Sequence, residues 1–124
     1  MKDFPNITDA ELQVMKILWN SSPLTASEII ELLNDNTNWN PKTIHTLISR
    51  LVKKNALSVE RTSPFYKYSP LVSEDELRKV ETKSFIQKLY NGSLHLLLSN
   101  FIKEENLSPE EIEDLKRILN ENHD

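Results

Sequence analysis

The sequence contains no cysteine and only one glycine, Gly92. Without cysteine the chain forms no disulfide, thiolate metal site or cysteine nucleophile, and it fits a reducing compartment. One glycine is too few for the glycine-rich loops that cradle nucleotide phosphates. The three histidines are scattered and no HExxH or GxSxG arrangement is present. We therefore expect no enzyme activity of the zinc or nucleophile-relay type.

Long apolar runs are also absent. No stretch approaches the roughly 18 residues of a membrane span, and the start MKDFPNITD lacks the apolar core of a signal peptide. With 124 residues, 38% of them hydrophobic, the chain is large enough to bury a core without disulfides or a metal. We expect a soluble, cytoplasmic protein with no membrane insertion and no cofactor.

Capping patterns mark the start of three helices in the first half of the chain. Residues 8–11 (TDAE) and 25–28 (TASE) have capping-box form, in which the hydroxyl accepts a backbone amide and the glutamate reaches back. Asn40 precedes Pro41, which suits a first helical turn because its missing amide hydrogen has no partner there. Each start is followed by apolar residues at helical spacing.

After residue 56 the pattern changes from helix to strand. Leu57 and Val59 alternate with polar residues, TSP follows as a turn, and an aromatic run, FYKY, covers residues 65–68. These runs predict a β-hairpin. Three helices followed by a hairpin is the order of a winged helix-turn-helix domain, which we assign to residues 1–72.

The second half is predicted to be helical. Capping boxes at residues 73–76 and 108–111 start two helices, and a third covers 94–103 after a break at Gly92. The expected fold class is mainly α with a small β-hairpin: a winged helix-turn-helix domain plus a C-terminal helical dimerisation region, residues 73–124.

The third predicted helix lies in a basic part of an acidic chain. Residues 40–67 hold six Lys or Arg and one carboxylate, although the whole chain has a net charge of −4. Four apolar residues recur at i, i+3, i+4 and i+7 and should face the core: Ile44, Leu47, Ile48 and Leu51.

The opposite side of that helix and its flanks carry basic and hydroxyl residues, the chemistry that suits phosphates and base edges in a DNA major groove. These residues are Lys42, Thr43, His45, Thr46, Ser49, Arg50, Lys53 and Lys54. On the hairpin, Arg61, Tyr66 and Lys67 could extend the contact to neighbouring phosphates. We expect one of Tyr66 and Tyr68 to pack inward. The alternatives are a merely solvated polar face, or a winged domain that binds protein.

The C-terminal helices are apolar on most of their faces, and three short helices are too few to enclose these side chains. The residues expected to be covered are Phe85, Ile86, Leu89, Tyr90, Leu94, Leu96, Leu97, Leu98, Phe101, Ile102, Ile112, Leu115, Ile118 and Leu119. A second copy of the same region would cover them in a homodimer. The alternative is a monomer in which these helices fold back on the winged domain.

The segment PKTIHTLISRLVKK, preceded by AELQVMKILW and followed by SVERTSPFYKYSPLV, resembles the penicillinase-repressor family of bacterial transcription repressors, the BlaI/MecI type. The resemblance continues through KSFIQKLYNGSLHLLLSNF to LSPEEIEDLKRILN. It implies a homodimer that binds palindromic double-stranded operator DNA and represses β-lactam resistance genes. It also places Lys42, Thr43, His45 and Thr46 at positions that contact bases or phosphates, with His45 where other members carry Arg.

The resemblance further implies that a membrane sensor metalloprotease cleaves the repressor when a β-lactam is present. The matching bond is Asn100–Phe101, so this chain would be the protease's substrate. A cut there would remove the last helix and weaken the dimer. Copper-responsive relatives carry a C-terminal cysteine cluster that this chain lacks, and His95 and His123 alone make a poor metal site.

Overall fold

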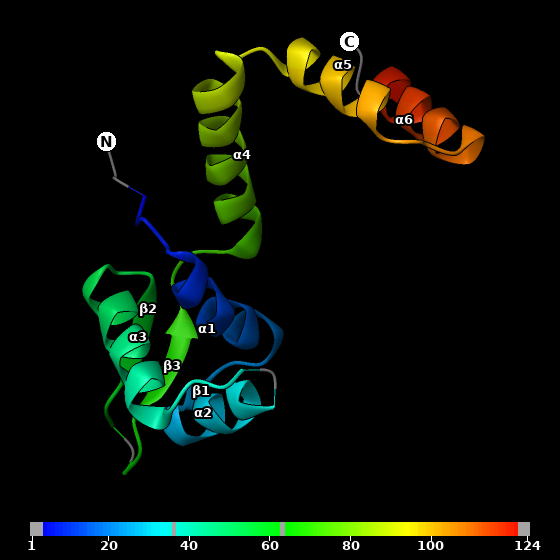
Figure 1. The fold of residues 1–124 in the computed structure, drawn as a ribbon. Coiled ribbons are helices and arrows are strands. Elements are labelled where there is room, and N and C mark those ends of the chain that lie inside the picture. Colours follow the sequence, from blue (N-terminus) through cyan, green and yellow to red (C-terminus); the bar gives the residue numbers. More distant parts are fainter. Residues whose placement is uncertain (1–3, 36, 63, 122–124) are drawn as a thin grey trace. The chain divides into compact units, whose positions relative to one another are not determined.

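The computed structural model describes residues 4–35, 37–62 and 64–121. The chain divides into two units, one ending at Val80 and the other starting at Glu81. The elements are labelled in Figure 1: α1 (Asp9–Asn20), β1 (Leu24–Thr25), α2 (Ala26–Asn34), α3 (Pro41–Lys53), β2 (Leu57–Glu60), β3 (Lys67–Pro70), α4 (Glu74–Tyr90), α5 (Leu94–Glu104) and α6 (Pro109–Glu121). The predicted fold class, mainly α with a small β-hairpin, is confirmed, and the hairpin is part of a three-stranded sheet.

The helices begin where the capping patterns predict. Thr8 and Thr25 both form capping boxes, with Glu11 and Glu28 respectively, at the N-termini of α1 and α2. The Asn40 Oδ1 accepts a hydrogen bond of 2.9 Å from the Thr43 N–H and so caps α3. These local hydrogen bonds satisfy amides that have no partner inside the helix, and each fixes the first residue of its helix.

The sheet is three-stranded and antiparallel, in the order β1-β3-β2. The predicted hairpin is present, with Val59 opposite Tyr68 and Glu60 opposite Lys67. The strand β3 begins only at Lys67, so Phe65 and Tyr66 lie in the connecting loop and not in a strand. The strand β1 was not predicted, because two residues are too short to show an alternating pattern; it pairs with β3 through Leu24 and Tyr68.

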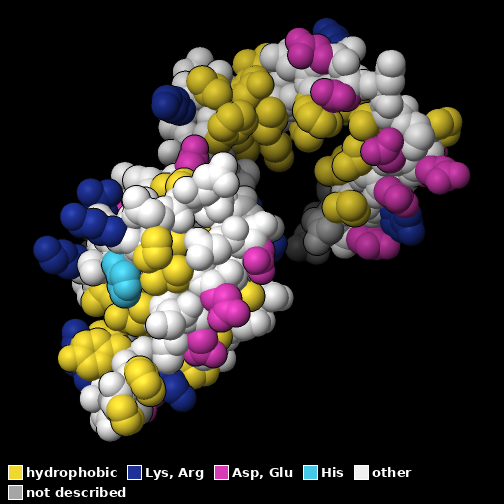
Figure 2. Space-filling model, turned by 60° about the horizontal axis from the view of Figure 1, so that its bottom comes forward, with side chains coloured by type: hydrophobic (Ala, Val, Ile, Leu, Met, Phe, Trp, Pro, Cys, Tyr) yellow, Lys and Arg dark blue, Asp and Glu magenta, His cyan; other side chains and the backbone are white. Residues whose placement is uncertain are grey.

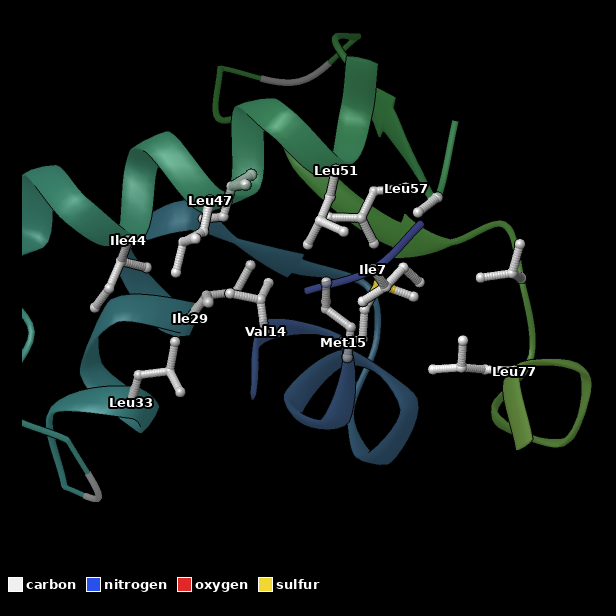
Figure 3. Close-up of a cluster of buried hydrophobic side chains, with 14 residues drawn as sticks. Ile7, Val14, Met15, Ile29, Leu33, Ile44, Leu47, Leu51, Leu57 and Leu77 are labelled. Carbon is white, nitrogen blue, oxygen red and sulfur yellow. The ribbon is translucent and has the colours of Figure 1, made fainter. Parts of the chain in front are cut away.

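The core of the first unit lies between α1, α2, α3 and the sheet, as Figure 3 shows. The four predicted core residues of α3, from Ile44 to Leu51, are all buried, with at most 5% of their surface exposed. They pack with Val14 and Met15 of α1 and Ile29 of α2. Burial of large aliphatic side chains supplies most of the stabilisation, roughly 1.5–3 kcal/mol for each.

The start of α4 belongs to this core. Leu77 is buried with it, and the Trp19 Nε1–H donates a hydrogen bond of 2.9 Å to the main-chain oxygen of Val72. The segment that leads into α4 is therefore fixed to α1. Since Leu77 packs here, the division between the two units falls inside α4, several residues after the start of the predicted second domain.

The second unit contains the end of α4 together with α5 and α6. Asn91 and Gly92 have positive φ values of 51° and 83°, and the turn they make ends α4. A side chain at position 92 would also meet Gln87, whose Oε1 would lie 2.9 Å from a Cβ atom, so glycine suits this turn. No described residue of α5 or α6 is buried.

Candidate nucleic-acid interface

The side of α3 turned away from the core forms the centre of the candidate interface. Ile44, Leu47, Ile48 and Leu51 are buried and Val52 packs partly against the core, so the polar side chains of the helix lie on the surface. The predicted residues that are exposed there are Lys42, Thr43, His45, Thr46, Ser49, Arg50 and Lys53. The structure therefore brings seven of the eight predicted α3 residues to the surface, on one stretch of helix. We call these seven side chains the α3 surface.

The positive charges of the α3 surface have no ion-pair partner in the described part of the chain. Among the residues that the structure describes, no carboxylate lies within ion-pair distance of Lys42, Arg50 or Lys53. Figure 2 shows dark-blue basic side chains gathered along one edge of the first unit, while magenta carboxylates lie elsewhere on the same view. Exposed, unpaired basic side chains are suited to binding an anionic surface.

Two side chains of the α3 surface differ in what they can offer a ligand. The Thr46 hydroxyl donates a hydrogen bond of 3.0 Å to the main-chain oxygen of Lys42, so its proton is used within the helix. Its oxygen lone pairs and its methyl group remain available for contact with a ligand. Ser49 is exposed as well, and no hydrogen bond holds its hydroxyl among the described residues.

Lys54 is placed differently from the other predicted residues. Its Nζ lies 2.5 Å from Glu11 Oε1 and 2.7 Å from the main-chain oxygen of Asn6, and it donates to both. The side chain of Lys54 is 30% exposed, and that of Glu11 is 1% exposed. The ammonium group of Lys54 is thus directed at a buried carboxylate, while that of its neighbour Lys53 faces solvent.

Glu11 is ionised in this environment. Burial raises the pKa of the Glu11 carboxyl, but hydrogen bonds from Lys54 and from the Thr8 N–H, together with the charge of Lys54, outweigh burial and hold the pKa below 4.5. This pair was not predicted from the sequence, although a signal existed: Glu11 lies on the apolar face of α1, one turn before Val14 and Met15. A carboxylate on that face requires a partner.

The hairpin carries the other predicted residues. Arg61 lies with its guanidinium carbon 5.4 Å from the centre of the Tyr66 ring, and the Tyr66 side chain is 50% exposed. Tyr68 packs against the core, so of the two tyrosines it is the one that points inward, and Tyr66 faces solvent. Phe65 is 69% exposed beside them. Its position in the loop was not predicted, because the sequence places it in a strand.

Lys67 is exposed at the start of β3, opposite Glu60. It also lies near Glu28, whose pKa is lowered chiefly by hydrogen bonds from the Thr25 N–H and hydroxyl and, to a smaller extent, by the positive charge of Lys67. The positive charge of Lys67 therefore acts partly on the Glu28 carboxylate.

The predicted cleavage and dimerisation residues lie in the second unit. Asn100 and Phe101 are in the middle of α5; Asn100 is exposed and Phe101 is 51% exposed. Ten of the fourteen residues expected to be covered are exposed in the single chain: Phe85, Leu89, Leu94, Leu96, Phe101, Ile102, Ile112, Leu115, Ile118 and Leu119. The other four, Ile86, Tyr90, Leu97 and Leu98, are half-buried.

Within the described part of the chain, no group of three or more His, Asp or Glu side chains lies close enough together to hold a metal ion. His95 is exposed on α5, and His123 lies outside the described residues. None of the helices described combines the length and the hydropathy that crossing a membrane requires.

Comparison with known proteins identifies the family. A model of the penicillinase repressor family matches residues 7–121. The chain belongs to the penicillinase repressor family. It is 40% identical to the penicillinase repressor of Bacillus licheniformis over 121 residues, which cover 98% of this chain and 94% of that protein. It is also 40% identical to the methicillin resistance regulatory protein MecI of Staphylococcus aureus over 114 residues, which cover 92% and 93% of the two chains.

Solved structures of this repressor family match the fold. The solution structure of the DNA-binding domain of the repressor BlaI is 41% identical, with a TM-score of 0.55, over 61% of this chain and 93% of that chain. The monomeric form of Bacillus licheniformis BlaI in complex with the blaP half-operator matches with a TM-score of 0.54, at the same identity and coverage. The predicted family and fold class are confirmed, and membership in a family of repressors confirms that the chain is not an enzyme.

Proposed function

We propose that this protein is a transcriptional repressor that binds double-stranded DNA through α3 and the hairpin. The observation that carries the proposal is the α3 surface, whose basic side chains are exposed and unpaired within the described residues. The fold is shared with Bacillus licheniformis BlaI, which has been solved with the blaP half-operator. A repressor acts on the chromosome, so we place the protein in the cytoplasm.

The roles of the side chains follow from their chemistry. Lys42, Arg50 and Lys53 are cations that suit phosphates and fix the position of the protein on the duplex. Thr43, His45, Thr46 and Ser49 are shorter polar groups that suit base edges in the major groove. Arg61, Tyr66 and Lys67 extend the contact from the hairpin to a neighbouring part of the backbone. Lys54 is left out of this set, because its ammonium group is bound to Glu11.

We propose that the protein acts as a homodimer formed by residues 73–124. Support comes from the large apolar side chains of α5 and α6 that the single chain leaves uncovered, among them Phe101 and Leu119. Burying several such side chains from each copy could offset the loss of freedom on association. A two-fold dimer would present two α3 surfaces to the two halves of a palindromic operator.

We further propose that the regulated genes confer β-lactam resistance. The relatives from Bacillus licheniformis and Staphylococcus aureus bear the names penicillinase repressor and methicillin resistance regulatory protein. Release from DNA would follow cleavage of Asn100–Phe101 by a membrane sensor metalloprotease. The bond lies within α5, so local opening of that helix must precede the cut. The cut would remove α6 and weaken the dimer without altering the DNA contacts.

A charge-reversal experiment tests the DNA-binding surface. Lys42→Glu/Arg50→Glu should abolish binding to a random-sequence duplex in fluorescence anisotropy, because two phosphate contacts become repulsive. The control is Lys79→Glu/Lys83→Glu, which makes the same change in net charge on exposed positions of α4. The control should keep most of the affinity. Equal loss in both variants would mean that net charge alone governs binding, and failure of the parent protein to bind any duplex would refute the proposal.

A further inference from the structure

Glu11 is the only charged side chain that is buried among the residues the structure describes. It lies on the face of α1 that also buries Val14, Met15 and Leu18. An ionised carboxylate in such surroundings loses its hydration, which costs several kcal/mol unless a partner compensates. An apolar residue of similar size would fill the same space without that cost. The presence of a charge here calls for an explanation other than core stability.

The partner of Glu11 is distant in the sequence and lies at the C-terminal end of α3. Lys54 is the C-cap residue of α3, 43 residues further along the chain. Glu11 Oε1 accepts from Lys54 Nζ at 2.5 Å and from the Thr8 N–H at 2.9 Å, and the Lys54 ammonium also donates to the Asn6 oxygen at 2.7 Å. Three parts of the chain therefore meet at this pair: the segment before α1, the first turn of α1 and the end of α3.

Both charges lie where the helices favour them. Glu11 is in the first turn of α1, close to the positive end of that helix dipole, and Lys54 is at the C-terminus of α3, close to a negative end. The Asn6 oxygen is also held in place, because the next residue, Ile7, is buried in the core with Met15, Leu51 and Leu57 (Figure 3). The Lys54 ammonium thus binds acceptors that the core itself positions.

The remaining contacts of α3 with the core are aliphatic. Ile44, Leu47, Ile48 and Leu51 pack against α1, α2 and the sheet, and apolar burial has no preferred direction. Such packing holds the helix against the core. The Glu11–Lys54 pair adds a short, directed polar contact at the C-terminal end of α3. It therefore constrains the direction of that end in a way that apolar contacts alone do not.

We propose that Glu11 and Lys54 are positioning residues for DNA recognition, which set the register of the α3 surface relative to α1 without touching the DNA. The inference rests on the proposed DNA-binding function. It assigns adjacent lysines opposite roles: Lys53, exposed and unpaired within the described residues, binds a phosphate, whereas Lys54 orients the helix. Loss of the pair should lower the preference for the specific sequence more than it lowers binding to DNA in general.

The test compares Lys54→Met with Lys53→Met. Both changes remove one positive charge at neighbouring positions and keep an unbranched apolar side chain. Each protein is titrated, over a series of salt concentrations, with the duplex that the parent enriches most strongly from a random-sequence library and with a random-sequence duplex. For Lys54→Met, the ratio of the affinities for the selected and the random-sequence duplex should fall roughly tenfold, about the effect of one mismatched base pair. Its slope of log affinity against log salt should equal that of the parent protein. Lys53→Met should keep the preference and lower the slope by about one.

Two further variants distinguish loss of the ion pair from loss of the folded structure. Lys54→Met leaves a buried charge unpaired, so Glu11→Gln/Lys54→Met, which has no buried charge, is measured as well, with the folded fraction of each protein checked by circular dichroism. The double variant should also lose preference, and Lys54→Arg, which keeps the pair, should retain it. If the folded double variant prefers the selected duplex as strongly as the parent does, the inference is overturned. It is also overturned if the slope of log affinity against log salt falls by about one in Lys54→Met, because Lys54 would then contact a phosphate itself. If the parent itself binds no duplex, the proposed function fails instead.

Discussion

The guanidinium carbon of Arg61 lies 5.4 Å from the centre of the Tyr66 ring, in the loop that joins β2 to β3. An exposed contact of this kind stabilises by only about 0.5–1 kcal/mol, so it contributes little to folding. Its effect is to reduce the conformational freedom of a long basic side chain before any ligand arrives. A partly ordered Arg61 loses less entropy when it binds a phosphate.

Arg61→Ala should weaken binding to every duplex and lower the slope of log affinity against log salt by about one, because one phosphate contact is lost. Anisotropy titrations over a series of salt concentrations measure this slope. Lys79→Ala is the matched control, since it removes one exposed positive charge from α4, where Lys79 pairs with Asp75. Equal slopes for Arg61→Ala and the parent protein would remove Arg61 from the interface.

Thr46→Ala should change which bases are preferred, with little change in the salt slope. The Thr46 hydroxyl proton is bound to the Lys42 oxygen, so the variant loses the oxygen acceptor and the methyl group that face a ligand. Selection from a random-sequence library, followed by sequencing, measures the preference. Thr82→Ala, on the exposed part of α4, should rank all sequences as the parent does. The same ranking for Thr46→Ala would show that this residue does not contact bases.

Leu119→Asp should weaken self-association, because Leu119 is 64% exposed in the single chain and a carboxylate there would have to be buried by a second copy. Sedimentation equilibrium should show dissociation at concentrations where the parent is dimeric. Asn120→Asp introduces the same charge at the adjacent exposed position of α6 and should leave the dimer intact. If the dimer of Leu119→Asp has the same dissociation constant as the parent dimer, Leu119 does not lie in the dimer interface.

The free energy of unfolding of the first unit should depend on pH because of the ionisation of Glu11. The pKa of Glu11 is lowered below 4.5 in the folded chain, so its ionisation stabilises the fold above that pH, and the contribution is lost as pH falls through the folded pKa. The difference in free energy of unfolding between the parent and Glu11→Gln should therefore be largest near neutral pH and should narrow in more acidic solution. Urea denaturation from about pH 7 to about pH 3 follows it, and a constant difference would contradict the lowered pKa.

In cells exposed to a β-lactam, mass spectrometry of the repressor should find a fragment that ends at Asn100. The reason is the resemblance to the penicillinase-repressor family, which implies cleavage of Asn100–Phe101. The cut would remove the end of α5 and all of α6 and so weaken the dimer. Phe101→Pro replaces the Asn100–Phe101 bond by an Asn–Pro bond, which the protease should not cleave. The chain of this variant should therefore stay intact in cells exposed to the β-lactam. Full-length repressor in cells that already express the resistance genes would mean that release from DNA follows another route.

The helices were predictable because their signals are local. Capping boxes span four residues, and the apolar positions of α3 recur within three turns, so Ile44 to Leu51 could be placed in the core from the sequence. The strand β1 could not, because it exists only through pairing with Tyr68 and Lys67. The same holds for Glu11 and Lys54, whose contact joins residues 43 positions apart. Interactions distant in sequence leave no periodic pattern, although a charge on an apolar face marks where one is needed.

The candidate site was predictable to the extent that it lies on one helix. The seven residues of the α3 surface follow from helical geometry once the apolar face is known. The eighth, Lys54, was grouped with them by charge alone, and only the tertiary structure shows its ammonium group directed at Glu11. On the hairpin, the loop position of Phe65 and Tyr66 depends on where the ladder of β2 and β3 ends. That end point is set by pairing and not by the local sequence.

Selection of sequences by the purified parent protein from a random-sequence duplex library shows whether a pair of α3 surfaces binds one duplex. If two α3 surfaces bind one duplex in a symmetric dimer, the enriched sequences should be palindromic, with half-sites about one helical turn or a multiple of it apart. A charge-reversed Lys42→Glu/Arg50→Glu protein should enrich nothing. Enrichment of a single unrepeated half-site would contradict the dimer, and no enrichment by the parent would contradict the account as a whole.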